Sequence, residues 1–143
     1  MSEQKPWLHV RAVGMDLLLP TADLREVVAP SPVAPLPGCP QGIQGVVIHQ
    51  GEFLPVLAWE DLPGRTGSPA PPVALAVVRP RLGIPIERIF GTNHVPPGAL
   101  QEIDEAVPAG AWLGGSARIG ELDFQLVDMV RLIALLRRFR GDR

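Results

Sequence analysis

Seventeen prolines are spread along almost the whole of this 143-residue chain, and they restrict its fold more than any other feature. Proline lacks a backbone N–H and its ring clashes inside a helix, so prolines spread this widely exclude a mostly helical fold. The sequence therefore predicts a β-rich protein. The run over residues 29–40 contains five prolines, which predicts an extended surface connection instead of a central strand.

Length, charge and cysteine content predict a single cytoplasmic domain. The 13 basic and 15 acidic side chains nearly cancel, so no overall field recruits nucleic acid or an anionic membrane. Cys39 is the only cysteine, which excludes an intrachain disulfide and the usual cysteine zinc clusters. The N-terminus lacks the pattern of a signal peptide, and no apolar run approaches the ~18 residues of a membrane helix. We expect no nucleic-acid partner and no membrane insertion.

Short apolar runs separated by glycine predict strands joined by tight turns. The clearest hairpin is "GIQGVVIHQGEFLPVL", with strands at about 43–49 and 52–58 joined at Gln50-Gly51. A second pair of strands flanks Gly14, and residues 21–28 begin as one helical turn and end as a strand.

The second half of the chain repeats features of the first. Residues 63–72 contain almost nothing to bury and predict a linker between a first lobe at 7–62 and a second lobe with the terminal helix at 73–140. Strands exchanged between the lobes remain an open alternative within this single domain of residues 1–143. An interval of 69 residues separates Gly14 from Gly83, Gly45 from Gly114, Gly51 from Gly120, and Glu52 from Glu121. This interval predicts a duplication.

The chain ends with the pattern of one amphipathic helix. Asp128 is a good N-cap, and Gly141 stands where a C-cap glycine would. Apolar residues follow Asp128 at helical spacing: Met129, Val130, Leu132, Ile133, Leu136 and Phe139. We expect this helix to close the fold against a core.

The search for chemistry predicts no catalytic residue, no metal site and no cofactor. No His or carboxylate accompanies a histidine at the spacing of a helical metal site. The "GGSARIG" stretch resembles a nucleophile elbow around Ser116, but Arg118 replaces the final glycine. A hydrolase is therefore the last alternative. A carbohydrate- or peptide-binding barrel is the second, and it requires the tryptophans to converge on one face: Trp7, Trp59 and Trp112.

The order of these segments resembles the CheW-like family, the coupling proteins of bacterial chemosensory systems. The resemblance runs from Trp7 to Leu136 and rests on "LREVV", "PQGIQGVVIHQGEFLPVLAWEDLPG" and "GGSARIGELDFQLVDMVRLIALL". It implies an all-β fold of two SH3-like five-stranded barrels around a hydrophobic core, without enzymatic activity. It also implies a cytoplasmic adaptor that couples chemoreceptors to a histidine kinase in signalling arrays.

The resemblance also implies two contact surfaces. The segment expected to meet the cytoplasmic tip of a chemoreceptor comprises Leu24, Glu26, Val27 and Gln50. The residues expected to meet the regulatory domain of a CheA-type histidine kinase are Ile43, Gly45, Val46 and Gly51. Kinase regulatory domains of the same fold join such proteins end to end, which implies self-association or ring assembly.

One position departs from the family pattern. The hairpin turn normally presents an arginine, and Gln50 supplies neither a charge nor a bidentate fork. This predicts, as an alternative, an auxiliary member that binds receptors without activating the kinase, or one that serves gliding or twitching motility. A further alternative is that Gln50 is a tolerated turn residue.

Overall fold

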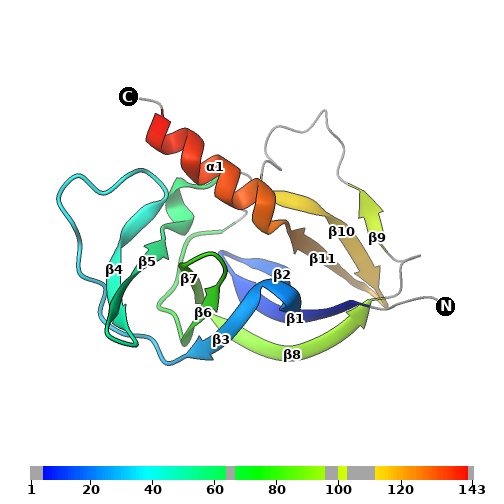
Figure 1. Cartoon of the computed structure of the whole chain (residues 1–143). Helices are drawn as coiled ribbons and strands as arrows, with labels where there is room; N and C mark the ends of the chain where they lie inside the picture. The colour runs from blue at the N-terminus through cyan, green and yellow to red at the C-terminus, as the bar shows by residue number, and fades with distance from the viewer. Residues whose placement is uncertain (1–4, 64–66, 96–99, 103–111, 142–143) are drawn as a thin grey trace.

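The chain folds into two β-sheets and a C-terminal helix, α1, that lies across the top of both sheets in the view of Figure 1. The computed structural model describes residues 5–63, 67–95, 100–102 and 112–141. The elements in chain order are β1 (Lys5–Ala12), β2 (Met15–Pro20), η1 (Thr21–Asp23), β3 (Leu24–Val28), β4 (Ile43–His49), β5 (Glu52–Leu57), η2 (Trp59–Asp61), β6 (Ala74–Val78), β7 (Leu82–Ile86), β8 (Arg88–Val95), β9 (Leu100–Glu102), β10 (Leu113–Ile119), β11 (Leu122–Val127) and α1 (Met129–Gly141).

Each sheet takes strands from both halves of the sequence. One sheet has the order β3-β6-β7-β5-β4, and the other has the order β8-β1-β2-β11-β10-β9. The β1–β2 hairpin, from the first half of the chain, lies between β8 and β11 of the second half. The β6–β7 hairpin, from the second half, lies between β3 and β5 of the first half. The ranges 7–62 and 73–140 are not separate lobes, because neither range holds all the strands of a sheet. Two five-stranded lobes are nevertheless present, and β9 extends one of them.

The duplication is real in strand order, but its interval is 70 residues and not 69. Gly45 and Gly115 both follow a bulge in the first strand of a hairpin, with φ values of 155° and 151°. Gln50 and Gly120 both begin the hairpin turn, with φ values of 52° and 63°. Gly45 therefore corresponds to Gly115 and Gln50 to Gly120, so the pairs Gly45–Gly114, Gly51–Gly120 and Glu52–Glu121 are out of register by one residue.

The largest core cluster lies between the sheets and α1. Trp59 and Trp112 meet edge to face in it, with ring centroids 5.5 Å apart. The indole N–H of Trp59 donates to the carbonyl of Pro85 at 2.8 Å, and that of Trp112 donates to the carbonyl of Pro63. These bonds allow two large amphipathic rings to be buried without leaving an unsatisfied donor.

Helix α1 begins as predicted. Asp128 accepts the backbone N–H of Arg131 through its Oδ1 at 3.1 Å, as an N-cap does. The buried stripe consists of Met129, Leu132, Leu135 and Leu136. Val130, expected on the apolar face, is instead 81% exposed, because its position on the helix lies beside this stripe and not in it. Within the described residues, no helix has both the length and the apolar character needed to cross a membrane.

Candidate docking surface

The β4–β5 hairpin presents two large apolar side chains to solvent. Ile48 and Phe53 face each other across the strands and are 63% and 68% exposed. Their neighbours Val47 and Leu54 point into the sheet's own core, as the alternation of a β-strand requires. Sequence reasoning missed this pair, because the alternation around Gln50-Gly51 separates the two faces of the hairpin but does not show which face stays uncovered.

The equivalent hairpin in the other sheet shows that the fold does not require apolar residues here. At an interval of 70 residues, Arg118 and Asp123 replace Ile48 and Phe53 and occupy the same cross-strand register. They form an exposed ion pair, with Arg118 Nη1 3.7 Å from Asp123 Oδ1. Exposed apolar side chains lower solubility unless something covers them, so Ile48 and Phe53 indicate a contact surface.

The turn that joins β4 and β5 is built for a tight reversal. Gln50 and Gly51 both have positive φ, at 52° and 75°, as a type I′ hairpin turn requires. A Cβ on Gly51 would meet no heavy atom within 4 Å, so this glycine serves the backbone conformation and does not relieve crowding. Both residues are exposed at the tip of the hairpin.

A side-chain hydrogen bond joins the two edge strands of the five-stranded sheet. Nε2 of His49, at the end of β4, contacts Oε1 of Glu26 on β3. Strands β3 and β4 stand at opposite edges of this sheet, so the pair shows that the sheet curls until its edges approach. Glu26 is thereby held beside the turn that contains Gln50.

The four residues predicted to contact a receptor are therefore only partly gathered. Glu26 and Gln50 lie close to each other through His49, and Val27 is 39% exposed on the outer face of β3. Leu24 is half-buried and packs against the main core. Glu26 and Val27 are consecutive residues of β3, so their side chains point to opposite faces of this edge strand, and Glu26 is the one that lies beside the hairpin turn.

The residues predicted to contact the kinase are mostly covered by the chain itself. Ala34, from the proline-rich connection, pairs with Val46 through two backbone hydrogen bonds of 2.8 and 2.9 Å. A Cβ on Gly45 would lie 2.4 Å from the carbonyl oxygen of Ala34. Gly45 and Val46 are buried, Ile43 packs against the main core, and only Gly51 stands at the tip.

A cation reaches the hairpin from another part of the chain. Arg81, in the turn between β6 and β7, places Nη1 2.6 Å from Oε2 of Glu52. Its Nη2 donates to the carbonyl of Phe53 at 2.7 Å. The hairpin thus carries a guanidinium close to its tip although its turn residue is Gln50. Spacing along the sequence does not reveal this contact.

The metal-site, hydrolase and tryptophan-lined binding-site alternatives find little support in the described residues. Among the residues that the structure describes, no three His, Cys, Asp or Glu side chains gather as metal ligands. Ser116 lies in the middle of β10, opposite Gln125, and not at the strand-to-helix turn of a nucleophile elbow. The tryptophans do not converge, because Trp7 packs in a different cluster from Trp59 and Trp112.

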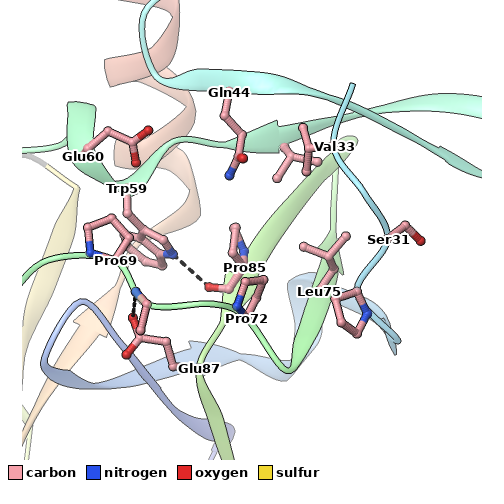
Figure 2. Close-up of a pocket in the computed structure, with 13 residues that line it drawn as sticks. Ser31, Val33, Gln44, Trp59, Glu60, Pro69, Pro72, Leu75, Pro85 and Glu87 are labelled. Atoms are coloured by element: carbon pink, nitrogen blue, oxygen red, sulfur yellow. Dashed lines mark hydrogen bonds between the residues drawn. The ribbon is translucent and has the colours of Figure 1, made fainter. Parts of the chain in front are cut away.

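One cavity of about 630 Å³ borders Trp59 and is walled mainly by prolines and aliphatic side chains (Figure 2). The polar groups at its wall already serve the fold: the Trp59 indole N–H points to Pro85, and Glu87 Oε2 accepts the N–H of Ala70 at 3.2 Å. The same oxygen accepts the N–H of Val13 at 2.8 Å. Glu87 thereby connects the linker at Ala70 to the turn between β1 and β2.

The five-stranded sheet, the six-stranded sheet and the C-terminal helix define a two-lobed β-protein. The family model described as "CheW-like domain" matches residues 6–137, and the chain belongs to this family. Its two lobes are the SH3-like barrels of that family. The fold is similar to that of the scaffolding protein TtCheW from Thermoanaerobacter tengcongensis, with a TM-score of 0.77 and 14% sequence identity over 90% of this chain and 87% of that chain. No curated protein matches by sequence.

Proposed function

We propose that this protein is a non-enzymatic adaptor that couples chemoreceptors to a CheA-type histidine kinase in the cytoplasm. The observation that carries the proposal is the exposed Ile48–Phe53 pair, which stands where the duplicated hairpin has a solvated ion pair. Membership of the CheW-like family supports the partners, and the similar structure belongs to a scaffolding protein. Self-association into rings is part of the same proposal.

In this proposal two neighbouring surfaces bind two different partners. The edge strand β3 and the neighbouring turn meet the receptor tip, because they offer the exposed apolar Val27, the carboxylate of Glu26 and the amide of Gln50. The Ile48–Phe53 pair meets the regulatory domain of the kinase, because apolar side chains at the centre of an interface contribute most when water is excluded. Both surfaces lie on the same sheet, so one molecule can hold both partners.

Glu26→Lys is expected to weaken binding to a receptor-tip fragment by about tenfold or more, because a charge reversal at a contact leaves like charges opposed. The part-buried hydrogen bond between Glu26 and His49 stabilises the fold by about 1 kcal/mol, so the melting temperature should fall by about 4 °C or less. Isothermal titration calorimetry and thermal unfolding measure the two effects.

Glu121→Lys is the matched control, because Glu121 is an exposed acid in the turn of the duplicated hairpin. It should bind the receptor fragment as the wild type does. Unchanged binding by Glu26→Lys, or an equal loss in both variants, would contradict the assignment of the receptor surface.

The second candidate function, an auxiliary member that binds receptors without activating the kinase, follows from Gln50. A guanidinium at this position would form charge-assisted hydrogen bonds worth about 1.5 to 3 kcal/mol, against about 1 kcal/mol for a neutral amide. Gln50→Arg should therefore raise affinity for the receptor tip or the kinase regulatory domain several-fold, and the gain should shrink as salt is raised. Titrations at two salt concentrations test this.

Kinase autophosphorylation with receptors present separates the two candidates. The wild type stimulates it if the protein is a full coupler, and only Gln50→Arg stimulates it if the protein is auxiliary. Equal affinity and equal stimulation for both proteins would show that Gln50 is only a turn residue.

A further inference from the structure

We propose that the cavity beside Trp59 binds a small organic cation, in which an ammonium group is carried on an apolar body. We call this site the Trp59 cavity. Its volume of about 630 Å³ lies within the range of small-molecule pockets. None of the residues that the proposed function assigns to the receptor or to the kinase lines it, so the inference goes beyond that function and does not depend on it.

The walls of the Trp59 cavity are apolar and stiff. The proline-rich connection contributes Pro30, the linker contributes Pro69 and Pro72, and β7 contributes Pro85. A proline ring fixes φ, so the wall changes shape less at these positions than it would with other residues. The indole of Trp59 is also fixed, because its N–H donates to the carbonyl of Pro85 at 2.8 Å (Figure 2). The cavity is therefore preformed for the apolar body of a ligand.

The polar groups at the wall accept hydrogen bonds more than they donate them. A proline offers a carbonyl but no N–H, and the indole N–H of Trp59 is already used. The amide of Gln44 points into the cavity in Figure 2, and its Nε2 donates to the carbonyl of Leu57 at 3.0 Å, which leaves Oε1 as an acceptor. Glu87 keeps the acceptor capacity of Oε1, since its bonds recorded in the described part of the chain use Oε2. A protonated amine matches this wall, because it has three donors and no acceptor.

The charge at the wall also favours a cation. Glu60 and Glu87 contribute two carboxylates, and none of the described lining residues is Lys, Arg or His. Carboxylates beside apolar walls of low dielectric raise the local concentration of cations and repel anions. Trp59, whose ring borders the cavity, adds to this preference, because the face of an indole attracts an ammonium group within about 6 Å. An organic cation is therefore favoured over a neutral or anionic molecule of the same shape.

A ligand in the Trp59 cavity would contact segments that are far apart in the sequence. Val33 lines the cavity from the proline-rich connection and Ala70 from the linker, while Gln44 belongs to β4 and Trp59 to η2. The cavity exists only when these segments are packed together, so the unfolded chain offers no such site. A ligand that binds only the folded chain raises its melting temperature, which gives a second measure of binding.

The test uses the full chain and three probes of similar shape: phenethylammonium, 2-phenylethanol and 3-phenylpropionate. Proton–nitrogen NMR spectra report the indole N–H of each of the three tryptophans, and the signal lost in Trp59→Phe is that of Trp59. Phenethylammonium should shift this signal with a dissociation constant below about 1 mM, the alcohol should bind about tenfold more weakly, and phenylpropionate should not bind. Higher salt should reduce the difference between the amine and the alcohol. Trp7, which packs in another cluster, is the internal control.

Gln44→Lys should abolish binding of phenethylammonium, because it places an ammonium group in the cavity and retains a hydrogen-bond donor for the carbonyl of Leu57. Glu60→Gln should weaken binding about tenfold, because it removes a charge and keeps the shape of the side chain. Gln41→Lys and Glu121→Gln are matched controls, since both residues are exposed and neither lines the cavity. Thermal unfolding confirms that the four variants fold, and the amine should raise the melting temperature most in the wild type and the controls.

Three results would overturn the inference: a dissociation constant for the amine above about 1 mM, equal affinity for the three probes, or undiminished binding by Gln44→Lys and Glu60→Gln. Equal shifts of the Trp7 and Trp59 signals would also overturn it, because the amine would then bind without a defined site. The proposed adaptor function fails separately, since titrations with the receptor tip and the kinase decide it. Gln44→Lys and Glu60→Gln should bind both partners as the wild type does.

Discussion

Gly45→Ala is expected to lower the free energy of unfolding by about 3 kcal/mol or more, and Gly51→Ala by only about 1 kcal/mol. Both glycines have positive φ, at 155° and 75°, so both substitutions force an L-residue into an unfavourable conformation. Only Gly45 is crowded as well, because a new Cβ would lie 2.4 Å from the carbonyl oxygen of Ala34. That oxygen belongs to a backbone hydrogen-bonded pair with Val46 and cannot move away cheaply.

Urea denaturation of the two variants and the wild type measures this difference. Gly51→Ala is the control for the backbone effect alone, since its Cβ would meet nothing within 4 Å. Equal losses of stability would mean that the connection at Ala34 yields without cost, and the close approach to Gly45 would not matter. A larger substitution such as Gly45→Asp would therefore be a poor test of kinase binding, because the variant would lose its fold together with any contact.

Exchanging the Ile48–Phe53 pair for the ion pair of the duplicated hairpin is expected to weaken binding to the kinase regulatory domain by about 100-fold or more. Truncating a central apolar contact of an interface typically costs 2 kcal/mol or more, and the double variant Ile48→Arg/Phe53→Asp removes two such contacts. The fold should accept the change, because Arg118 and Asp123 already occupy this register on β10 and β11. The free energy of unfolding should stay within about 1 kcal/mol of the wild type.

The reverse exchange supplies the control. Arg118→Ile/Asp123→Phe places the apolar pair on the other sheet and should leave kinase binding unchanged. Binding is measured by isothermal titration calorimetry, and receptor-tip binding is measured on the same samples. If the first double variant still binds the kinase domain tightly, the Ile48–Phe53 pair is not the kinase contact and the proposed division of the two surfaces is wrong.

Local sequence patterns were sufficient for much of the fold. The prolines excluded a helical protein, and the positions of Gln50-Gly51 and Asp128 located a hairpin turn and a helix start that the structure confirms. These features depend on φ preferences and on hydrogen bonds between residues close in sequence, which one stretch of chain decides by itself. Val130 was placed on the wrong face of the helix and the buried Leu135 was omitted from the apolar stripe, because a step of one residue along a helix turns the side chain by about 100°.

The candidate site was predictable only in part, because local patterns decide only features formed by residues close in sequence. The hairpin at residues 42–57 and the strand "LREVV" were found from their patterns and their resemblance to the CheW-like family. The alternation of β4 and β5 distinguishes the two faces of the hairpin, but it does not say which apolar residues stay uncovered. Ile48 and Phe53 became recognisable only when the duplicated hairpin showed Arg118 and Asp123 in their place.

Tertiary structure decided the remaining features, all of which join residues distant along the chain. Ala34 covers Gly45, His49 holds Glu26 across two sheet edges, and Arg81 reaches Glu52. The exchange of hairpins between sheets belongs to the same group. A hydrophobic period specifies which face of a strand is buried, but it contains no information about which strand will lie beside it. That choice depends on how all the buried faces fit together. The sequence by itself therefore determined the strands, turns and helix, and only the tertiary structure determined which of them lie side by side.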